Sequence, residues 1–177
     1  VGSEFRVNDI LIGGQGQPSI SKLSDGNVII VWESPKVAFT DVFDVKAQIL
    51  DNSGNKINNE FYINSYTDDD QSEPMVLGLE KGGFVSVWQS NHQDGDGYGI
   101  FGKIFDNSGT ATSSEFLINS YYNSDQLLPR LTETSDGGFA VSWSSNLQDG
   151  DNFGVFARKF NSKGEALTEE FQLNTTS

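Results

Sequence analysis

The stretch GGFVSVWQSNHQDGDGYGIFGKIFDNSG, from Gly82 to Gly109, decides the fold, because nearly the same string returns as GGFAVSWSSNLQDGDNFGVFARKFNSKG from Gly137 to Gly164. A shorter string, Glu-Phe-x-x-Asn, starts at residues 4, 60, 115 and 170, which are 56, 55 and 55 residues apart. Self-similarity at a fixed period is the signature of a repeat architecture. The pattern therefore predicts a single domain over residues 1–177, built from repeats at about 4–59, 60–114 and 115–169 with an extra terminal strand at 170–174.

Each repeat contains four segments with the length and composition of β-strands, and helix signals are almost absent. β-Branched and aromatic residues are enriched in strands, and Gly or Asn at the connections can take the positive φ of tight hairpin turns. Such turns join antiparallel neighbours, so we expect a four-stranded antiparallel meander in each repeat. In the second repeat the four segments are 60–64 (EFYIN), 74–79 (PMVLGL), 83–88 (GFVSVW) and 100–105 (IFGKIF).

The segment that ends in tryptophan is largely apolar on both faces. Side chains alternate across a strand, and in the second repeat Phe84 and Trp88 lie on one face while Val85 and Val87 lie on the other. A strand that is apolar on both sides must lie between two packed layers. An inner strand of a propeller blade has this environment, because neighbouring blades stack face to face. We therefore expect an all-β fold of three propeller-blade-like units, with a three-fold trefoil or β-prism as the alternative.

Acidic residues outnumber basic residues by 25 to 11, which gives the chain a net charge of −14. Negative charge repels phosphate backbones and anionic membrane surfaces, so nucleic acid is not an expected partner. No apolar run approaches the length needed to cross a bilayer, so we expect no membrane insertion. The absence of cysteine excludes disulfides, thiolate metal sites and cysteine nucleophiles.

Two long polar loops of each repeat should lie at the same end of its sheet. In an antiparallel meander the connections alternate between the two ends, so in the second repeat 65–74 (SYTDDDQSEP) and 90–99 (SNHQDGDGYG) emerge together. Hard cations prefer carboxylate and carbonyl oxygens, and glycine lets the backbone turn toward a bound ion. The loops therefore predict bound calcium, with ligands at Asp94, Asp96, Asp149 and Asp151.

The same loops offer polar side chains to another ligand, namely Asp70, Gln93, Tyr98, Asp125, Gln148 and Asn152. The structural alternative is that the aspartates accept hydrogen bonds from the loop backbone, as in Asx turns. The pattern is not an EF-hand, because Tyr98 stands where a third ligand belongs and Phe105 where the bidentate glutamate belongs. The first repeat lacks the motif over 33–44, where Asp41 and Asp44 are the candidate substitutes, so we expect two cation sites and not three.

The sequence contains no catalytic constellation. Its single histidine, His92, is replaced by Leu147 in the third repeat, and the common hydrolase and phosphate-binding motifs are absent. Carboxylate pairs can hydrolyse glycosides, but aspartates copied in tandem are typical of periodic structure. We therefore expect no enzymatic activity. A carbohydrate-binding, lectin-like module, with loop tyrosines stacked on sugars, is the second hypothesis, and a glycan-cleaving enzyme is the third.

The two long strings quoted above, each followed by Glu-Phe-x-x-Asn, resemble the tandem repeats of very large secreted or surface proteins, including bacterial adhesins and RTX-type calcium-associated proteins. The resemblance covers essentially the whole chain. It implies an extracellular or cell-surface location, a non-enzymatic adhesive or structural role, and calcium as a companion. The expected partners are other copies of the repeat, in a homo-oligomer for example, or a cell-surface or matrix component such as a glycan.

Overall fold

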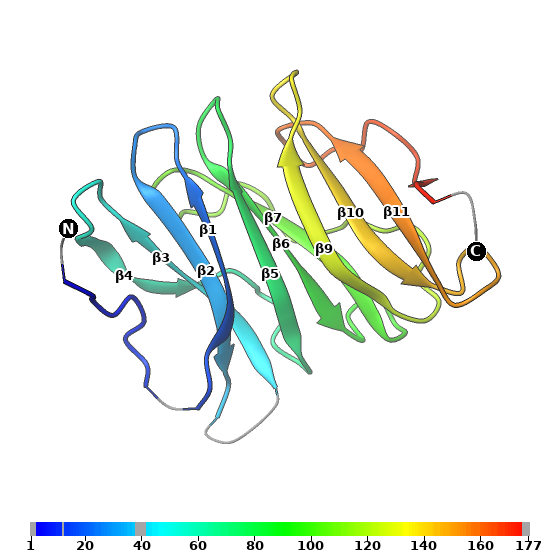
Figure 1. The fold of residues 1–177 in the computed structure, drawn as a ribbon, viewed down its shortest axis with the longest axis horizontal. Helices are drawn as coiled ribbons and strands as arrows, with labels where there is room; N and C mark the ends of the chain where they lie inside the picture. The colour runs from blue at the N-terminus through cyan, green and yellow to red at the C-terminus, as the bar shows by residue number, and fades with distance from the viewer. Residues whose placement is uncertain (1–2, 12, 38–41, 175–177) are drawn as a thin grey trace.

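The computed structural model describes residues 3–11, 13–37 and 42–174, which form three four-stranded antiparallel sheets and no helix (Figure 1). The first sheet comprises β1 (Gly16–Lys22), β2 (Val28–Pro35), β3 (Phe43–Leu50) and β4 (Lys56–Tyr62). The second comprises β5 (Gln71–Gly78), β6 (Phe84–Asn91), β7 (Tyr98–Phe105) and β8 (Phe116–Leu117). The third comprises β9 (Gln126–Glu133), β10 (Phe139–Asn146), β11 (Phe153–Phe160) and β12 (Phe171–Gln172). The predicted all-β fold of three tandem four-stranded units is confirmed, and no helix of the described residues could cross a membrane.

The sheets are offset by one strand from the repeats that begin at Glu-Phe-x-x-Asn. Each such string from Glu60 onward contributes to the last strand of a sheet, because β4, β8 and β12 pair with β3, β7 and β11. The terminal segment 170–174, which follows the third sequence repeat, therefore supplies β12 as the last strand of the third sheet. The first copy, at 4–8, belongs to none of the three sheets.

The three sheets stack in a row, with the second sheet between the first and the third (Figure 1). β5 lies against β1 and β2, and β9 lies against β5 and β6. We call the side of each sheet that carries its tryptophan the Trp face, and the opposite side the far face. The far face of one sheet packs against the Trp face of the next. This arrangement resembles successive propeller blades and differs from the three-fold closure of the alternative.

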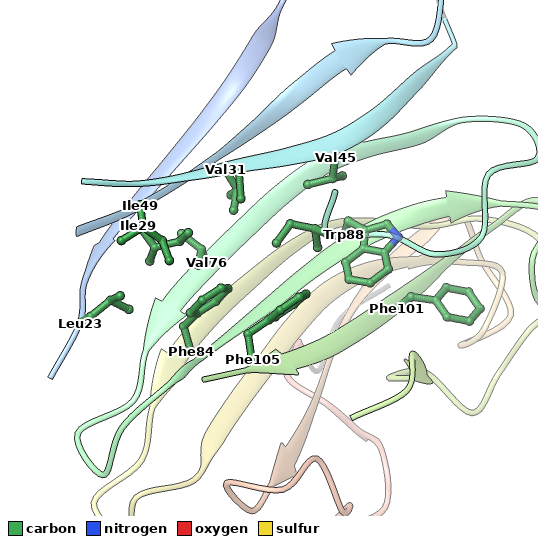
Figure 2. Packing of buried hydrophobic residues seen from close by; sticks show 12 residues of the cluster. Leu23, Ile29, Val31, Val45, Ile49, Val76, Phe84, Trp88, Phe101 and Phe105 are labelled. Atoms are coloured by element: carbon green, nitrogen blue, oxygen red, sulfur yellow. The ribbon is translucent and has the colours of Figure 1, made fainter. Parts of the chain in front are cut away.

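Each junction between sheets encloses an apolar core. In the first junction, Phe84 and Trp88 of the second sheet meet Val31 and Val45 from the far face of the first sheet (Figure 2). In the second junction, Trp143 of the third sheet meets the far face of the second sheet in the same way. Full burial of such a side chain stabilises the fold by roughly 1.5–3 kcal/mol. The apolar pattern on both faces of the tryptophan strand is thereby explained.

A Gln-x-x-Pro element recurs at residues 15–18, 71–74 and 126–129. It forms a bulge at the start of the first strand of each sheet. The residue before proline has a positive φ in all three copies, at Gln17, Glu73 and Leu128. In β5 the strand pairing shifts register between Ser72 and Met75. Proline fits beside a bulge because it has no N–H to donate to the ladder. The bulge lets the chain turn from the loop into the strand, and so it sets the position of the acidic loops.

Candidate functional site: the loop end of the sheets

The acidic loops lie together at one end of the stack, as their order along the chain predicts. We call this region the loop end, and it consists of residues 63–70, 92–97, 118–125 and 147–152. The backbone N–H of Asn91 donates to the carbonyl of Asp70 at 2.9 Å. His92 Nδ1 lies 3.2 Å from a carboxylate oxygen of Asp69. The loops before β5 and after β6 are therefore direct neighbours.

Asp94 and Asp149 are half-buried, and each lies over a glycine of the neighbouring strand. A Cβ added at Gly99 would collide with the Asp94 carboxylate, and one added at Gly154 would lie 2.7 Å from Asp149 Oδ2. Asn119 Nδ2 approaches Asp94 Oδ2 at 3.5 Å, and Gln172 Nε2 donates to Asp149 Oδ2 at 2.7 Å. Burial is the main reason why the pKa of Asp94 is raised. Each of the two carboxylates therefore covers the first residues of the strand that follows its loop, and we call this arrangement a side-chain lid.

Asp96 and Asp151 point to different partners and do not join these lids. The Asp96 carboxylate accepts a hydrogen bond from the backbone N–H of Ser124 at 3.0 Å, which links the second sheet to the next loop. Asp151 accepts from the backbone N–H and the side-chain amide of Asn152, both at 3.0 Å. Among the described residues there is no group of three or more His, Asp or Glu side chains that could hold a metal ion. The contacts of Asp96 and Asp151 are of the kind that the structural alternative describes, and calcium binding stays a prediction.

The candidate ligand residues Asp70, Tyr98 and Asp125 form a chain across two sheets. Tyr98 OH donates to Asp70 Oδ2 at 3.1 Å, and the Tyr98 backbone N–H donates to Asp125 Oδ1 at 3.1 Å. Asp70 also accepts hydrogen bonds from Phe43 N and Ser72 Oγ. Burial, followed by the negative charge of Asp70, raises the pKa of Tyr98 to about 12. These side chains are therefore already engaged with one another inside the protein.

Gln93 and Gln148 reveal two glutamates that the sequence analysis did not single out as site residues. Gln93 Nε2 donates to Glu115 at 2.8 Å, and Gln148 Nε2 donates to Glu170 at 2.9 Å. Glu115 also accepts the backbone N–H groups of Ser65 and Tyr66, which lie between the first and second sheets. Glu170 makes the same contacts with Ser120 and Tyr121. The recurrence of glutamate in every Glu-Phe-x-x-Asn string was the available signal.

In the first repeat a carboxylate lies at the position equivalent to that of Asp94, but it comes from a strand residue and not from a loop residue. Ser34 faces Asp44 across β2 and β3, as Ser90 faces Gly99 across β6 and β7. Asn64 Nδ2 donates to Asp44 Oδ1 at 2.7 Å, as Asn119 Nδ2 approaches Asp94. A strand residue thus replaces the loop aspartate of the later repeats. Asp41, the other candidate, lies outside the described residues.

Comparison with known proteins adds to the fold and not to the chemistry. No protein-family model and no curated protein matches the chain. Among solved structures the chain is similar to the crystal structure of a protein of unknown function from Dyadobacter fermentans DSM 18053, with a TM-score of 0.65 and 12% sequence identity. The match covers 95% of this chain and 57% of that one. At this identity the similarity shows a shared fold alone, and this chain spans little more than half of the length of the structure that it matches.

Proposed function

We propose that the chain is a non-enzymatic, extracellular repeat module for adhesion or structural assembly, and that the far face of its third sheet is the surface on which another copy of the repeat stacks. One observation carries this proposal. Apolar side chains on that face occupy positions whose counterparts in the first two sheets are covered by the next sheet. Repeat proteins gain much of their stability from such neighbour interfaces.

The counterpart positions can be compared directly. Ile100 and Ile118 of the second sheet are fully buried in the second junction, and Phe116 packs against the same core. Their equivalents in the third sheet are Val155, Leu173 and Phe171, whose exposed fractions are 41%, 51% and 48%. A hollow of about 280 Å³ lies beside them, lined in part by Ala140, Ala157 and Leu173. An exposed apolar face with a hollow is typical of an interaction surface.

The matching surface on a second copy is the Trp face of the first sheet. In both internal junctions the far face meets a Trp face, and the first sheet is the one whose Trp face is not covered by another sheet. Ile20 lies in β1 of this sheet and is 66% exposed. Residues 4–9 lie at the other edge of this sheet, along the β3–β4 turn and β4, where Asp9 pairs with Lys56. They imitate the outer strand of a preceding sheet, since the Phe5 ring lies over Gly54 as the Phe61 ring lies over Gly109. Head-to-tail association would replace this segment of the second copy with β12 of the first copy.

The loop end supports a structural role and gives no support to catalysis. Backbone N–H groups of the loop end donate to a carboxylate at both junctions, to Glu115 at the first and to Glu170 at the second. A contact that recurs in every repeat serves the repeat and not a single asymmetric reaction centre. The exposed pair of His92 and Asp69 has no counterpart in the third repeat, where the histidine is Leu147.

Analytical ultracentrifugation tests the stacking surface. We expect the weight-average mass to rise from one chain toward two as the concentration goes from micromolar to near-millimolar. The variant Val155→Asp/Leu173→Asp should stay monomeric. Leu147→Asp is the matched control, because Leu147 is 53% exposed but lies on a loop and not on the far face. A wild-type chain that is monomeric throughout, or a double variant that associates as the wild type does, would overturn the proposal.

A further inference from the structure

We propose that the first sheet carries a binding site for a neutral polyhydroxylated ligand of monosaccharide size, in a cavity on its Trp face at the loop end. The cavity has a volume of about 360 Å³, and its lining includes Ile10, Ser34, Lys36, Asp44, Lys46 and Tyr62. The site would supply the ligand class for the adhesive role, and in that respect it rests on the proposed function. It does not depend on stacking between copies, but it shares the Trp face of the first sheet with the stacking surface and is therefore open only where no copy is stacked on that sheet.

A serine whose hydroxyl has no hydrogen-bond partner in the described part of the chain contributes to the lining of the cavity. Ser34 is 2% exposed, and its Oγ has no hydrogen-bond partner among the described residues although Ser34 lines the cavity. Buried polar groups are nearly always hydrogen-bonded, so each exception requires an explanation. A ligand hydroxyl in the cavity could both donate to and accept from this serine.

The charges around the cavity are already paired, which favours a neutral ligand. Lys46 Nζ lies 2.6 Å from Glu60, and both side chains are less than 10% exposed. Lys36 Nζ lies 3.6 Å from Asp44. Asp44 also accepts the Asn64 amide, yet a carboxylate has about four acceptor sites. Asp44 can therefore accept a further hydrogen bond from a ligand hydroxyl without any change in net charge.

Apolar groups complete the lining of the cavity. Tyr62 is 54% exposed and Ile10 is 37% exposed. Lys46 Nζ lies 4.7 Å from the centroid of the Tyr62 ring, which holds the ring in place at the rim. Small-molecule sites combine apolar and aromatic walls with a few convergent polar groups. A sugar ring matches that combination, because its C–H face can pack on an aromatic ring while its hydroxyls reach serine and carboxylate oxygens.

The departure of the first repeat from the common motif explains where the cavity lies. The residue equivalent to Asp44 is Gly99 in the second repeat and Gly154 in the third, and the loop aspartate covers it. The first repeat has no Asp-Gly-Asp loop, and Pro35 and Lys36 follow the serine instead. Ser90 and Ser145 also have unpartnered hydroxyls, but they do not line this cavity. They therefore provide matched controls.

Saturation-transfer NMR and calorimetry with glucose, galactose, mannose, N-acetylglucosamine and glucuronate test the site. We expect at least one neutral sugar to bind, and Ser34→Ala, Asp44→Asn and Tyr62→Ala each to weaken its affinity about fivefold or more, which is the loss of one net hydrogen bond or stacking contact. Ser90→Ala should bind as the wild type does. If a variant fails to fold by circular dichroism, the remaining two decide.

Three outcomes would overturn the inference: no sugar binds, only glucuronate binds, or binding persists in every folded cavity variant. Ultracentrifugation of the same samples separates this result from the stacking proposal. Because a stacked copy would cover the cavity, sugar binding is measured at micromolar concentration, where the stacking proposal expects a monomer. A chain that associates at higher concentration but binds no sugar at micromolar concentration would refute the ligand class and leave assembly standing. A monomeric chain that binds sugar through Ser34 would refute stacking and leave the site standing.

Discussion

At the loop end, the first and second repeats place a carboxylate at equivalent positions but take it from different residues. The second repeat brings Asp94 from a loop to lie over Gly99, whereas the first repeat puts Asp44 on the strand itself. In each case an asparagine from the Glu-Phe-x-x-Asn string of the following repeat, Asn64 or Asn119, approaches the carboxylate. The position of the negative charge is thus shared while its origin in the sequence is not. The difference shows that the repeat requires an acceptor at this point more than it requires the Asp-Gly-Asp loop.

The first and second sheets differ in how the glutamate of their Glu-Phe-x-x-Asn string is used. Glu60, in the first sheet, forms a buried ion pair with Lys46 and accepts the backbone N–H of Asp9. Glu115, beside the last strand of the second sheet, accepts backbone and amide N–H groups without a cationic partner. The first arrangement includes a buried ammonium group that depends on its carboxylate. The second is a hydrogen-bonded link between two sheets.

The largest expected effect is therefore that of Glu60→Ala. Removing one partner of a buried ion pair leaves an uncompensated charge and typically lowers the free energy of unfolding by about 3–5 kcal/mol. Glu115→Ala should lower it by about 1–3 kcal/mol, the range for donors that lose their acceptor. Urea unfolding of both variants measures the difference. Glu60→Ala/Lys46→Met is the control, and it should recover much of the loss. Equal losses for the two alanine variants would contradict the distinction.

A smaller effect is expected where Asp94 lies over Gly99. Gly99→Ala would place a Cβ against the Asp94 carboxylate, which must then move. Because a side chain yields more readily than backbone, we expect a loss of about 1–2 kcal/mol, and a smaller loss for Gly99→Ala in an Asp94→Ala background. A double-mutant cycle by thermal unfolding measures this coupling. The control is Ser90→Ala. A glycine such as Gly150 is unsuitable as a control, because its positive φ of 94° would strain an alanine. A coupling energy near zero would show that Asp94 does not act as a lid.

The architecture could be predicted from the sequence because its signals are local and repeated. The 55-residue spacing and the apolar faces of the tryptophan strand lead directly to stacked four-stranded sheets. The offset of one strand was missed, because Glu-Phe-x-x-Asn marks the start of a sequence repeat but contributes to the end of a sheet. Periodicity defines the length of a repeat and leaves the choice of its first strand open.

The site was harder to predict because side chains compete for partners that sequence does not show. The proximity of the loops followed from antiparallel order alone. Whether Asp96 faces a cation or the backbone N–H of Ser124 depends on a contact between neighbouring sheets. The cavity beside Ser34 depends on the absence of a motif in one repeat, and the periodicity of the sequence carries no signal for a feature that occurs once.

The smallest expected effect is the change in unfolding midpoint when calcium is added. It tests whether a calcium ion or backbone N–H groups bind the carboxylates of the loop end. Extracellular calcium modules bind with dissociation constants of about 10⁻⁴ to 10⁻³ M, so millimolar calcium would raise the unfolding midpoint of a calcium-binding chain. If Asp94 is a structural lid, calcium should shift the midpoint by less than about 1 °C relative to chelator, both in the wild type and in Asp94→Asn. A calcium-dependent rise that Asp94→Asn abolishes would establish the ion site and remove the structural explanation.

The pH dependence of the same variant gives an independent test. Burial raises the pKa of Asp94, so the folded state favours the protonated carboxyl and is disfavoured by ionisation. The contribution of Asp94 to stability is therefore fully present below its unfolded pKa of about 3.9 and declines as the pH rises through the raised folded pKa. Asparagine does not titrate, so the midpoint of Asp94→Asn relative to the wild type should rise between acidic and neutral pH. Ser90→Ala removes no titrating group and is the control, so its midpoint relative to the wild type should not change with pH. A relative midpoint that falls with pH would mean that the ionised Asp94 carboxylate is stabilised in the folded protein, as a bound cation would stabilise it.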